Sequence, residues 1–165
     1  MDSLTFSFCY GILYLIMKGS VKMPSEKTIV KNLERAKNAS LNSDFCRQSI
    51  GAVLMQGNKV LAVGWNTSKT NPLQKVFNRY RNFKFDSRNN GTIHAEMMIL
   101  LKTRYMDLDW AKCVLYIYRE YKDTGNPALA HPCPACLHAL WGRGITQIYY
   151  SANNKRGWDK VEVED

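Results

Sequence analysis

The segment CVLYIYREYKDTGNPALAHPCPACLHALWGRGITQIYY, residues Cys113 to Tyr150, decides the predicted fold. It begins with CVLYIYRE and ends with ITQIYY, two apolar runs rich in β-branched and aromatic residues, as is typical of strands. Between them, PACLHALWGRG predicts a helix that ends at a glycine stop signal. A helix between two such strands indicates a parallel pair, so the chain is predicted to be an α/β protein.

Upstream elements extend this unit. PSEKTIVKNLERAKNAS (Pro24 to Ser40) predicts a helix, because Ser25 can cap it and apolar residues recur at helical spacing. SIGAVLMQGNKVLAVGWN (Ser49 to Asn66) predicts two mostly apolar strands joined at Gly57, a hairpin inside a sheet covered on both faces. KVEVE near the C-terminus predicts a weak fifth strand, and no repeat or linker divides the chain.

Length and composition indicate one globular domain. The chain has 165 residues, of which 45% are hydrophobic and 22% charged, and this profile excludes a disordered protein. The formal net charge is +9, from 23 Lys and Arg against 14 Asp and Glu. Such a charge favours anionic partners, either phosphate-bearing small molecules or nucleic acid, and also favours solubility.

More than half of this charge lies in one polar segment, Thr67 to Ile93, which carries a net charge of +5. A loop of this length inside a compact domain is usually functional, although LQKVFNRYRNF within it is compatible with a short helix. Its charged residues are Lys69, Lys75, Arg79, Arg81, Lys84 and Arg88, with Asp86 as the one acid.

The first 23 residues are predicted to be an apolar extension ahead of a domain that spans residues 24–165. The apolar run from Leu4 to Met17 has 14 residues, fewer than the roughly 20 that a membrane-spanning helix needs. It has neither a basic flank nor a small-residue cleavage site. We therefore expect an appended helix, or an upstream extension with the true start at Met17 or Met23, and no membrane partner.

The cysteines favour a reduced, cytoplasmic setting. Their number is odd, and a chain with a core of this size does not need disulfide bonds for stability. The five are Cys9, Cys46, Cys113, Cys133 and Cys136.

Two short motifs carry the candidate chemistry, HAEMMILLK from His94 and HPCPAC from His131. His94 heads a predicted helix, and the C-x-x-C pair Cys133 and Cys136 lies at the start of another, where the helix dipole favours thiolates. Together they supply three zinc ligands. Three protein ligands leave a coordination position for water, as in catalytic zinc sites.

Glu96 is a candidate proton-transfer group for this arrangement. Two residues after His94, its carboxylate can approach the metal without binding it, accept a proton from activated water and deliver it to a leaving group. Such a pair suits the addition of hydroxide to an unsaturated ring carbon followed by loss of ammonia. A structural zinc site has no use for this glutamate.

The HAE and PCPAC motifs, with the order of elements from Pro24 to Tyr150, resemble the cytidine and deoxycytidylate deaminase superfamily. The resemblance implies one catalytic Zn²⁺ held by His94, Cys133 and Cys136, with Glu96 as the proton shuttle. It implies a three-layer α/β/α sandwich around a central mixed sheet of four or five strands. Homo-oligomers are common in the family, so a homo-oligomer is expected.

Other positions match substrate-binding features of the family. Asn66 ends the second predicted strand, where related enzymes have an asparagine that contacts the substrate, although asparagine also forms turns. Backbone groups at Ala95 and Pro132 are expected to contact the base.

The substrate is predicted to be a cytosine nucleotide, with conversion of dCMP to dUMP favoured. The 27 residues between Asn66 and His94 are similar in length to those of deoxycytidylate deaminases, and a basic segment suits a 5′-phosphate. HAEMMIL, however, resembles the tRNA adenosine deaminases. Deamination of single-stranded DNA or RNA is therefore an alternative, and a non-catalytic zinc-binding module is another.

Overall fold

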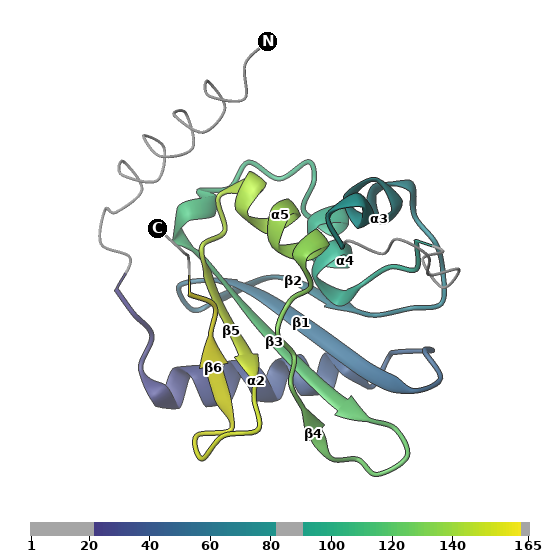
Figure 1. Ribbon diagram of the computed structural model, residues 1–165. Helices are drawn as coiled ribbons and strands as arrows, with labels where there is room; N and C mark the ends of the chain where they lie inside the picture. The colour runs from purple at the N-terminus through teal and green to yellow at the C-terminus, as the bar shows by residue number, and fades with distance from the viewer. Residues whose placement is uncertain (1–21, 82–90, 163–165) are drawn as a thin grey trace.

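Helices cover both faces of one β-sheet in the computed structural model, which describes residues 22–81 and 91–162 (Figure 1). Helix α2 lies across one face of the sheet, and α3, α4 and α5 lie on the other side. The three-layer α/β/α sandwich expected from the sequence is therefore confirmed. The described elements are α2 (Glu26–Ser40), β1 (Gln48–Gln56), β2 (Lys59–Trp65), α3 (Pro72–Phe77), η1 (Asn78–Arg81), α4 (Ala95–Lys102), η2 (Trp110–Lys112), β3 (Cys113–Tyr121), β4 (Pro127–Ala128), α5 (Pro134–Arg143), β5 (Gln147–Ser151) and β6 (Trp158–Lys160).

The sheet is mixed, with strand order β2-β1-β3-β5-β6 and with β4 paired to β3. Strands β3 and β5 are parallel, as the intervening helix predicts, and the other pairs are antiparallel. Within the described ranges the sheet has six strands. The additional one, β4, is only two residues long and begins with Pro127, which lacks the N–H of a normal ladder residue. The last strand lies mostly before KVEVE, at Trp158–Lys160.

Helix α2 packs very closely on the sheet. Its start is fixed by Ser25, whose side chain accepts a hydrogen bond from the Thr28 backbone N–H at 3.3 Å, as the sequence predicts. Opposite the helix, β1 carries Gly51, where a Cβ atom would collide with the backbone of Ala36 and Ser40. Glycine is therefore required at this contact because backbone atoms fill the space that a side chain would occupy.

Hydrophobic residues fill both interfaces of the sheet. The cluster under α2 includes Ile29, Leu33, Val53 and Tyr116, and the larger cluster lies under α4 and α5 on the opposite face. Because both faces are covered, the central strands are nearly continuous apolar runs rather than alternating ones.

Glycine also ends the helix that precedes the parallel strand. Gly144 follows α5 with φ 92°, and its N–H donates to the carbonyl oxygens of Leu140 and Trp141. This left-handed residue turns the chain into β5. The predicted glycine stop signal is thus confirmed.

Part of the expected N-terminal extension, residues 1–21, lies outside the described residues, and the division at residue 23 stays a prediction. Across residues 22–81 and 91–162, none of the helices combines the length and the apolar character required to traverse a bilayer.

The N-terminus of α4 is placed by another glycine. A Cβ atom at Gly64 on β2 would collide with the carbonyl oxygen of Ala95 and lie 3.2 Å from Cγ1 of Ile99. The first turn of α4, which carries His94 and Glu96, can therefore lie directly on the sheet only because residue 64 has no side chain.

We predict that Gly64→Ala shifts the N-terminus of α4, lowers the free energy of unfolding by about 1–3 kcal/mol through overpacking, and weakens zinc binding. Gly125→Ala is the control, because its Cβ meets no atom within 4 Å, although its φ of 67° is unfavourable for alanine. Urea unfolding and zinc content per chain measure both effects. Equal zinc content in the two variants would contradict the prediction.

Candidate metal centre and active site

Two helix N-termini meet at the candidate site. His94 is the N-cap residue of α4, and Cys133 is the N-cap residue of α5. Both have extended backbone conformations, and neither side chain caps its own helix. Their side chains point instead toward one another. One turn into α5, Cys136 completes the group, so three residues from two helix starts share one small volume.

The geometry of these three residues fits a zinc ion. His94 Nδ1 lies 3.6 Å from Cys133 Sγ and 3.5 Å from Cys136 Sγ, and all three ligand atoms lie within 4.8 Å of one another. Tetrahedral zinc, with bonds of about 2.3 Å to sulfur and 2.0–2.1 Å to nitrogen, places nitrogen about 3.5 Å from sulfur and the two sulfurs about 3.8 Å apart. The sulfur and nitrogen atoms can therefore bind one ion through Nδ1 with little movement.

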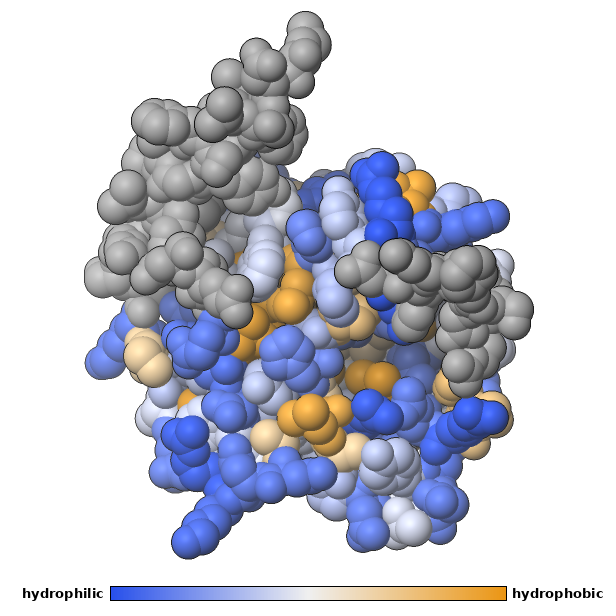
Figure 2. All heavy atoms as spheres, in the orientation of Figure 1, coloured by the Kyte–Doolittle hydropathy of each residue, from blue (hydrophilic) through white to orange (hydrophobic). Residues whose placement is uncertain are grey.

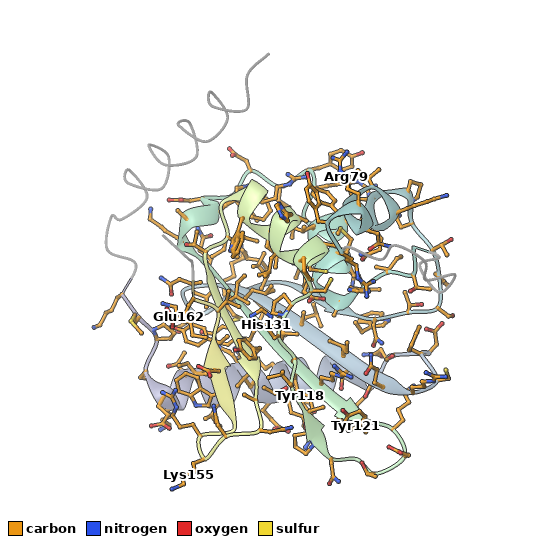
Figure 3. All side chains as sticks on the ribbon, viewed as in Figure 1. Arg79, Tyr118, Tyr121, His131, Lys155 and Glu162 are labelled. Carbon is orange, nitrogen blue, oxygen red and sulfur yellow. The ribbon has the colours of Figure 1, made fainter. Side chains whose placement is uncertain are left out.

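The site has three protein ligands in the described part of the chain. No other His, Cys, Asp or Glu among those residues joins the group. His131, in the loop before α5 (Figure 3), is exposed and packs its ring edge-on against Tyr150. His138 is also exposed and stacks on Tyr80. A three-ligand centre leaves a coordination position for water or substrate, as catalytic zinc sites do.

The metal-free thiols differ strongly in acidity. A hydrogen bond from the Cys136 thiol lowers the pKa of Cys133 to about 4, although burial opposes this, and His94 strengthens the shift. The same hydrogen bond, together with burial, raises the pKa of Cys136 well above 9.0. Burial alone lowers the pKa of His94, but its bond to Cys133 and the charge of Glu96 outweigh burial and raise it. Before a metal ion binds, therefore, Cys133 is the more acidic thiol of the pair and Cys136 is the one that keeps its proton.

Glu96 is buried beside this group. It is the second residue of α4 and is 5% exposed. Burial raises the pKa of its carboxyl group, while the charge of His94 opposes that shift. A raised pKa moves the carboxyl group toward neutral pH, and this favours both uptake and release of a proton.

The other predicted site residues lie around the same centre. Ala95 and Pro132 are buried next to the ligands in sequence. Asn66 is buried too, but its side chain serves the sheet: Oδ1 accepts from the Ile50 N–H at 2.8 Å, and Nδ2 donates to the Gln48 carbonyl at 3.1 Å. Contact of these three residues with substrate stays a prediction.

Three further residues, Gln74, Asn78 and Arg81, connect α3 and η1 to His94 and are not among the predicted site residues. Gln74 on α3 is fully buried and accepts a hydrogen bond from the His94 backbone N–H, while Arg81 Nη1 lies 3.5 Å from His94 Nε2. Asn78 accepts a hydrogen bond from Gln74. The basic charge of this segment is visible in the sequence, but a single glutamine carries no signal that it will be buried against a metal ligand.

The three-ligand centre, placed on an α/β sandwich, has the ligand set of a catalytic zinc site. Residues 25–152 match the model of the cytidine and deoxycytidylate deaminase zinc-binding region. Because that match covers most of the chain, the protein belongs to this family of zinc-dependent deaminases.

Solved structures agree with the fold. The chain resembles the dCMP deaminase from the cyanophage S-TIM5 with a TM-score of 0.51 and 19% identity, covering 81% of this chain and 89% of that one. It resembles a cytidine deaminase from Burkholderia pseudomallei with a TM-score of 0.53 and 16% identity, covering 80% and 90% respectively. No curated protein matches the chain in sequence.

We predict that zinc binding releases protons at pH 7–8. Cys136 has a raised pKa and carries its proton in the metal-free state, so zinc must displace that proton to bind the thiolate. For each proton released, the apparent zinc affinity should then fall about tenfold when the pH is lowered by one unit. Zinc titration in a weakly buffered solution with a pH indicator measures the release, and Cys46→Ser, at an exposed thiol, is the control. Zinc binding without proton release would contradict the prediction.

For the metal-free protein, we predict that Glu96→Gln is more stable than the parent at pH 7. Because the folded state raises the pKa of Glu96, folding binds a proton, and stability is lost as the pH rises above the ordinary value of 4.5. Glutamine removes this penalty, and each kcal/mol gained raises the midpoint by about 2–4 °C. Thermal unfolding from pH 4 to 8 tests this. A difference that is constant across this range would exclude the assigned cause.

Proposed function

We propose that the protein converts a cytosine nucleotide, with dCMP favoured, to the corresponding uracil nucleotide and ammonia. The observation that carries this proposal is the buried Glu96 carboxyl group beside a three-ligand centre that the basic segment contacts through Arg81. Water adds to C4 of cytosine, and the C4–N4 bond breaks to give a C4 carbonyl group and ammonia.

The residues of the site have different parts in this reaction. His94, Cys133 and Cys136 would hold a zinc ion, which would supply the Lewis acidity that makes water a nucleophile near neutral pH. Glu96 accepts a proton from the attacking water and delivers it to N3 of the ring. It then carries a second proton to the exocyclic nitrogen, which leaves as ammonia. Burial of Glu96 supports this part because the raised pKa matches a group that is protonated and deprotonated in each cycle.

The base and its sugar require contacts next to this centre. We assign Ala95 and Pro132 to the base through their backbone groups, since both flank metal ligands. Asn66 is assigned to the substrate as well, through the amide hydrogen that its bond to the Gln48 carbonyl leaves available.

A nucleotide rather than a nucleoside is supported by the position of Arg81. Histidine that binds metal through Nδ1 carries its proton on Nε2, so Nε2 and the guanidinium group 3.5 Å away are both donors. An anionic oxygen between or beside them is favourable. Arg79, on the same 3₁₀ turn, adds a second positive charge at this end of the molecule (Figure 3).

A polynucleotide substrate is the second candidate. It is favoured by the net charge of +9 and by exposed aromatic side chains, among them Tyr105 with 88% and Tyr121 with 44% exposure. Binding to single-stranded DNA would weaken steeply with added salt, by about one counterion for each phosphate contact.

The setting and assembly are also proposals. A reduced, cytoplasmic location is supported by the free cysteines among the described residues, namely Cys46, Cys113, Cys133 and Cys136. A homo-oligomer is proposed from the family alone. On the face shown in Figure 2, hydrophobic residues gather in small groups between hydrophilic ones.

We predict that the zinc-loaded protein deaminates dCMP faster than CMP, deoxycytidine or single-stranded DNA, and that Arg81→Ala raises KM for dCMP about tenfold or more. A charged hydrogen bond contributes about 1.5–3 kcal/mol, and Arg81→Ala removes such a bond to the phosphate of dCMP. Deoxycytidine has no phosphate, so its KM should not change in this variant. Ammonia release and product chromatography measure the rates.

Two controls accompany this panel. Glu96→Gln should abolish turnover while zinc remains bound, and Lys155→Ala, in the turn between β5 and β6 far from Arg79, should change nothing (Figure 3). A zinc-loaded protein inactive on every free cytosine nucleotide and nucleoside would exclude the mononucleotide function. Activity confined to single-stranded DNA would establish the second candidate.

A further inference from the structure

Gln74 is an unusual side chain for the buried face of a short helix. Helix α3 has six residues, and Gln74 is its one fully buried member, with 0% exposure. A buried amide without partners costs about 1–3 kcal/mol, so such a residue needs hydrogen bonds at both ends of its side chain. Gln74 has both: Oε1 accepts from the His94 backbone N–H at 3.1 Å, and Nε2 donates to Asn78 Oδ1 at 2.9 Å.

The bond to His94 fills a role that α4 cannot fill with its own residues. In a capping box, the side chain of a Glu or Gln at the third helical position accepts from the backbone N–H of the N-cap residue. His94 is the N-cap of α4, and the third position is Met97, which has no such acceptor and is buried in the core. Gln74 therefore supplies, from another helix, the acceptor that the local sequence lacks.

The same segment contacts His94 a second time. Asn78 begins η1, and η1 ends at Arg81, whose Nη1 lies 3.5 Å from His94 Nε2. Between them, Tyr80 stacks on His138 of α5 with ring centroids 3.8 Å apart and planes 13° apart. The segment is thus fixed to α5, which carries the cysteine ligands, and it reaches His94 both at the backbone N–H and at the outer edge of the ring.

We propose that Gln74 is a positioning residue for the metal centre: it fixes the backbone of His94 so that Nδ1 faces the two cysteine sulfurs, and it connects the basic segment to this ligand. The inference concerns metal binding, needs no particular substrate, and can be tested apart from the deaminase reaction. Residues that orient metal ligands contribute about 10- to 100-fold to metal affinity or activity.

The test compares variants of the zinc-loaded and cobalt-substituted protein. Gln74→Met keeps the length of the side chain and removes both hydrogen bonds. We expect zinc release to a chromophoric chelator to be about 10- to 100-fold faster, and the visible cobalt bands, which report ligand geometry, to shift. Gln74→Glu keeps an acceptor for the His94 N–H, and the native cobalt spectrum should largely return in this variant.

Leu73→Ala is the matched control. Leu73 packs α3 against the core and its side chain makes no hydrogen bond, so Leu73→Ala weakens this packing while it keeps the Gln74 amide and both of its hydrogen bonds. We expect a lower unfolding midpoint with native zinc release and cobalt spectrum. Equal acceleration of zinc release in Leu73→Ala, or release within twofold of native in Gln74→Met, would overturn the proposal.

A measurement on the unaltered protein covers the case in which Gln74→Met does not fold. The His94 amide should exchange its hydrogen slowly, because it is bonded to a buried acceptor. Exchange as fast as that of an exposed turn amide such as Thr124 would overturn the proposal without any variant.

Discussion

Two helices begin over the same part of the sheet, and the chemistry of the protein depends on how closely their first residues approach. An N-cap residue is not yet helical, so its side chain is free to leave the helix direction. His94 and Cys133 both use this freedom to face a common point. Gly64 permits α4 to lie on β2, and the parallel pairing of β3 with β5 fixes α5 beside it. The positive ends of both helix dipoles then favour the thiolate of Cys133.

Local sequence patterns were sufficient for the larger part of this structure. Ser25 marks a helix start because its side chain can cap the helix. Gly57 and Gly144 mark a hairpin turn and a helix end because glycine, which has no side chain, adopts the positive φ that both positions require. The ligands were found for a related reason. Zinc binds nitrogen and sulfur atoms at fixed separations, and the HAE and PCPAC motifs supply them with few other candidate ligands in the sequence.

The features that were missed depend on contacts between distant segments. Strand β4 forms because it pairs with β3 and not because of its own composition. It begins with Pro127, a residue that argues against a strand in sequence-based prediction. The two hydrogen bonds from the Asn66 side chain to the backbone of β1 join segments that are far apart in sequence, and contact of Asn66 with substrate stays a prediction. Gln74 has no local feature that distinguishes it from a surface glutamine. Its meaning comes only from where α3 lies relative to His94.

The unequal acidity of the two cysteines also affects the handling of the protein. At neutral pH the metal-free site holds the Cys133 thiolate beside the Cys136 thiol, at the start of a helix and in C-x-x-C spacing. This is the arrangement in which a thiolate is reactive toward oxidants and a neighbouring thiol can trap the product as a disulfide. Zinc therefore has a protective value apart from catalysis, because it occupies both sulfurs. Removal of the metal in air would damage the ligands themselves, so restoring the enzyme would require a reductant as well as zinc.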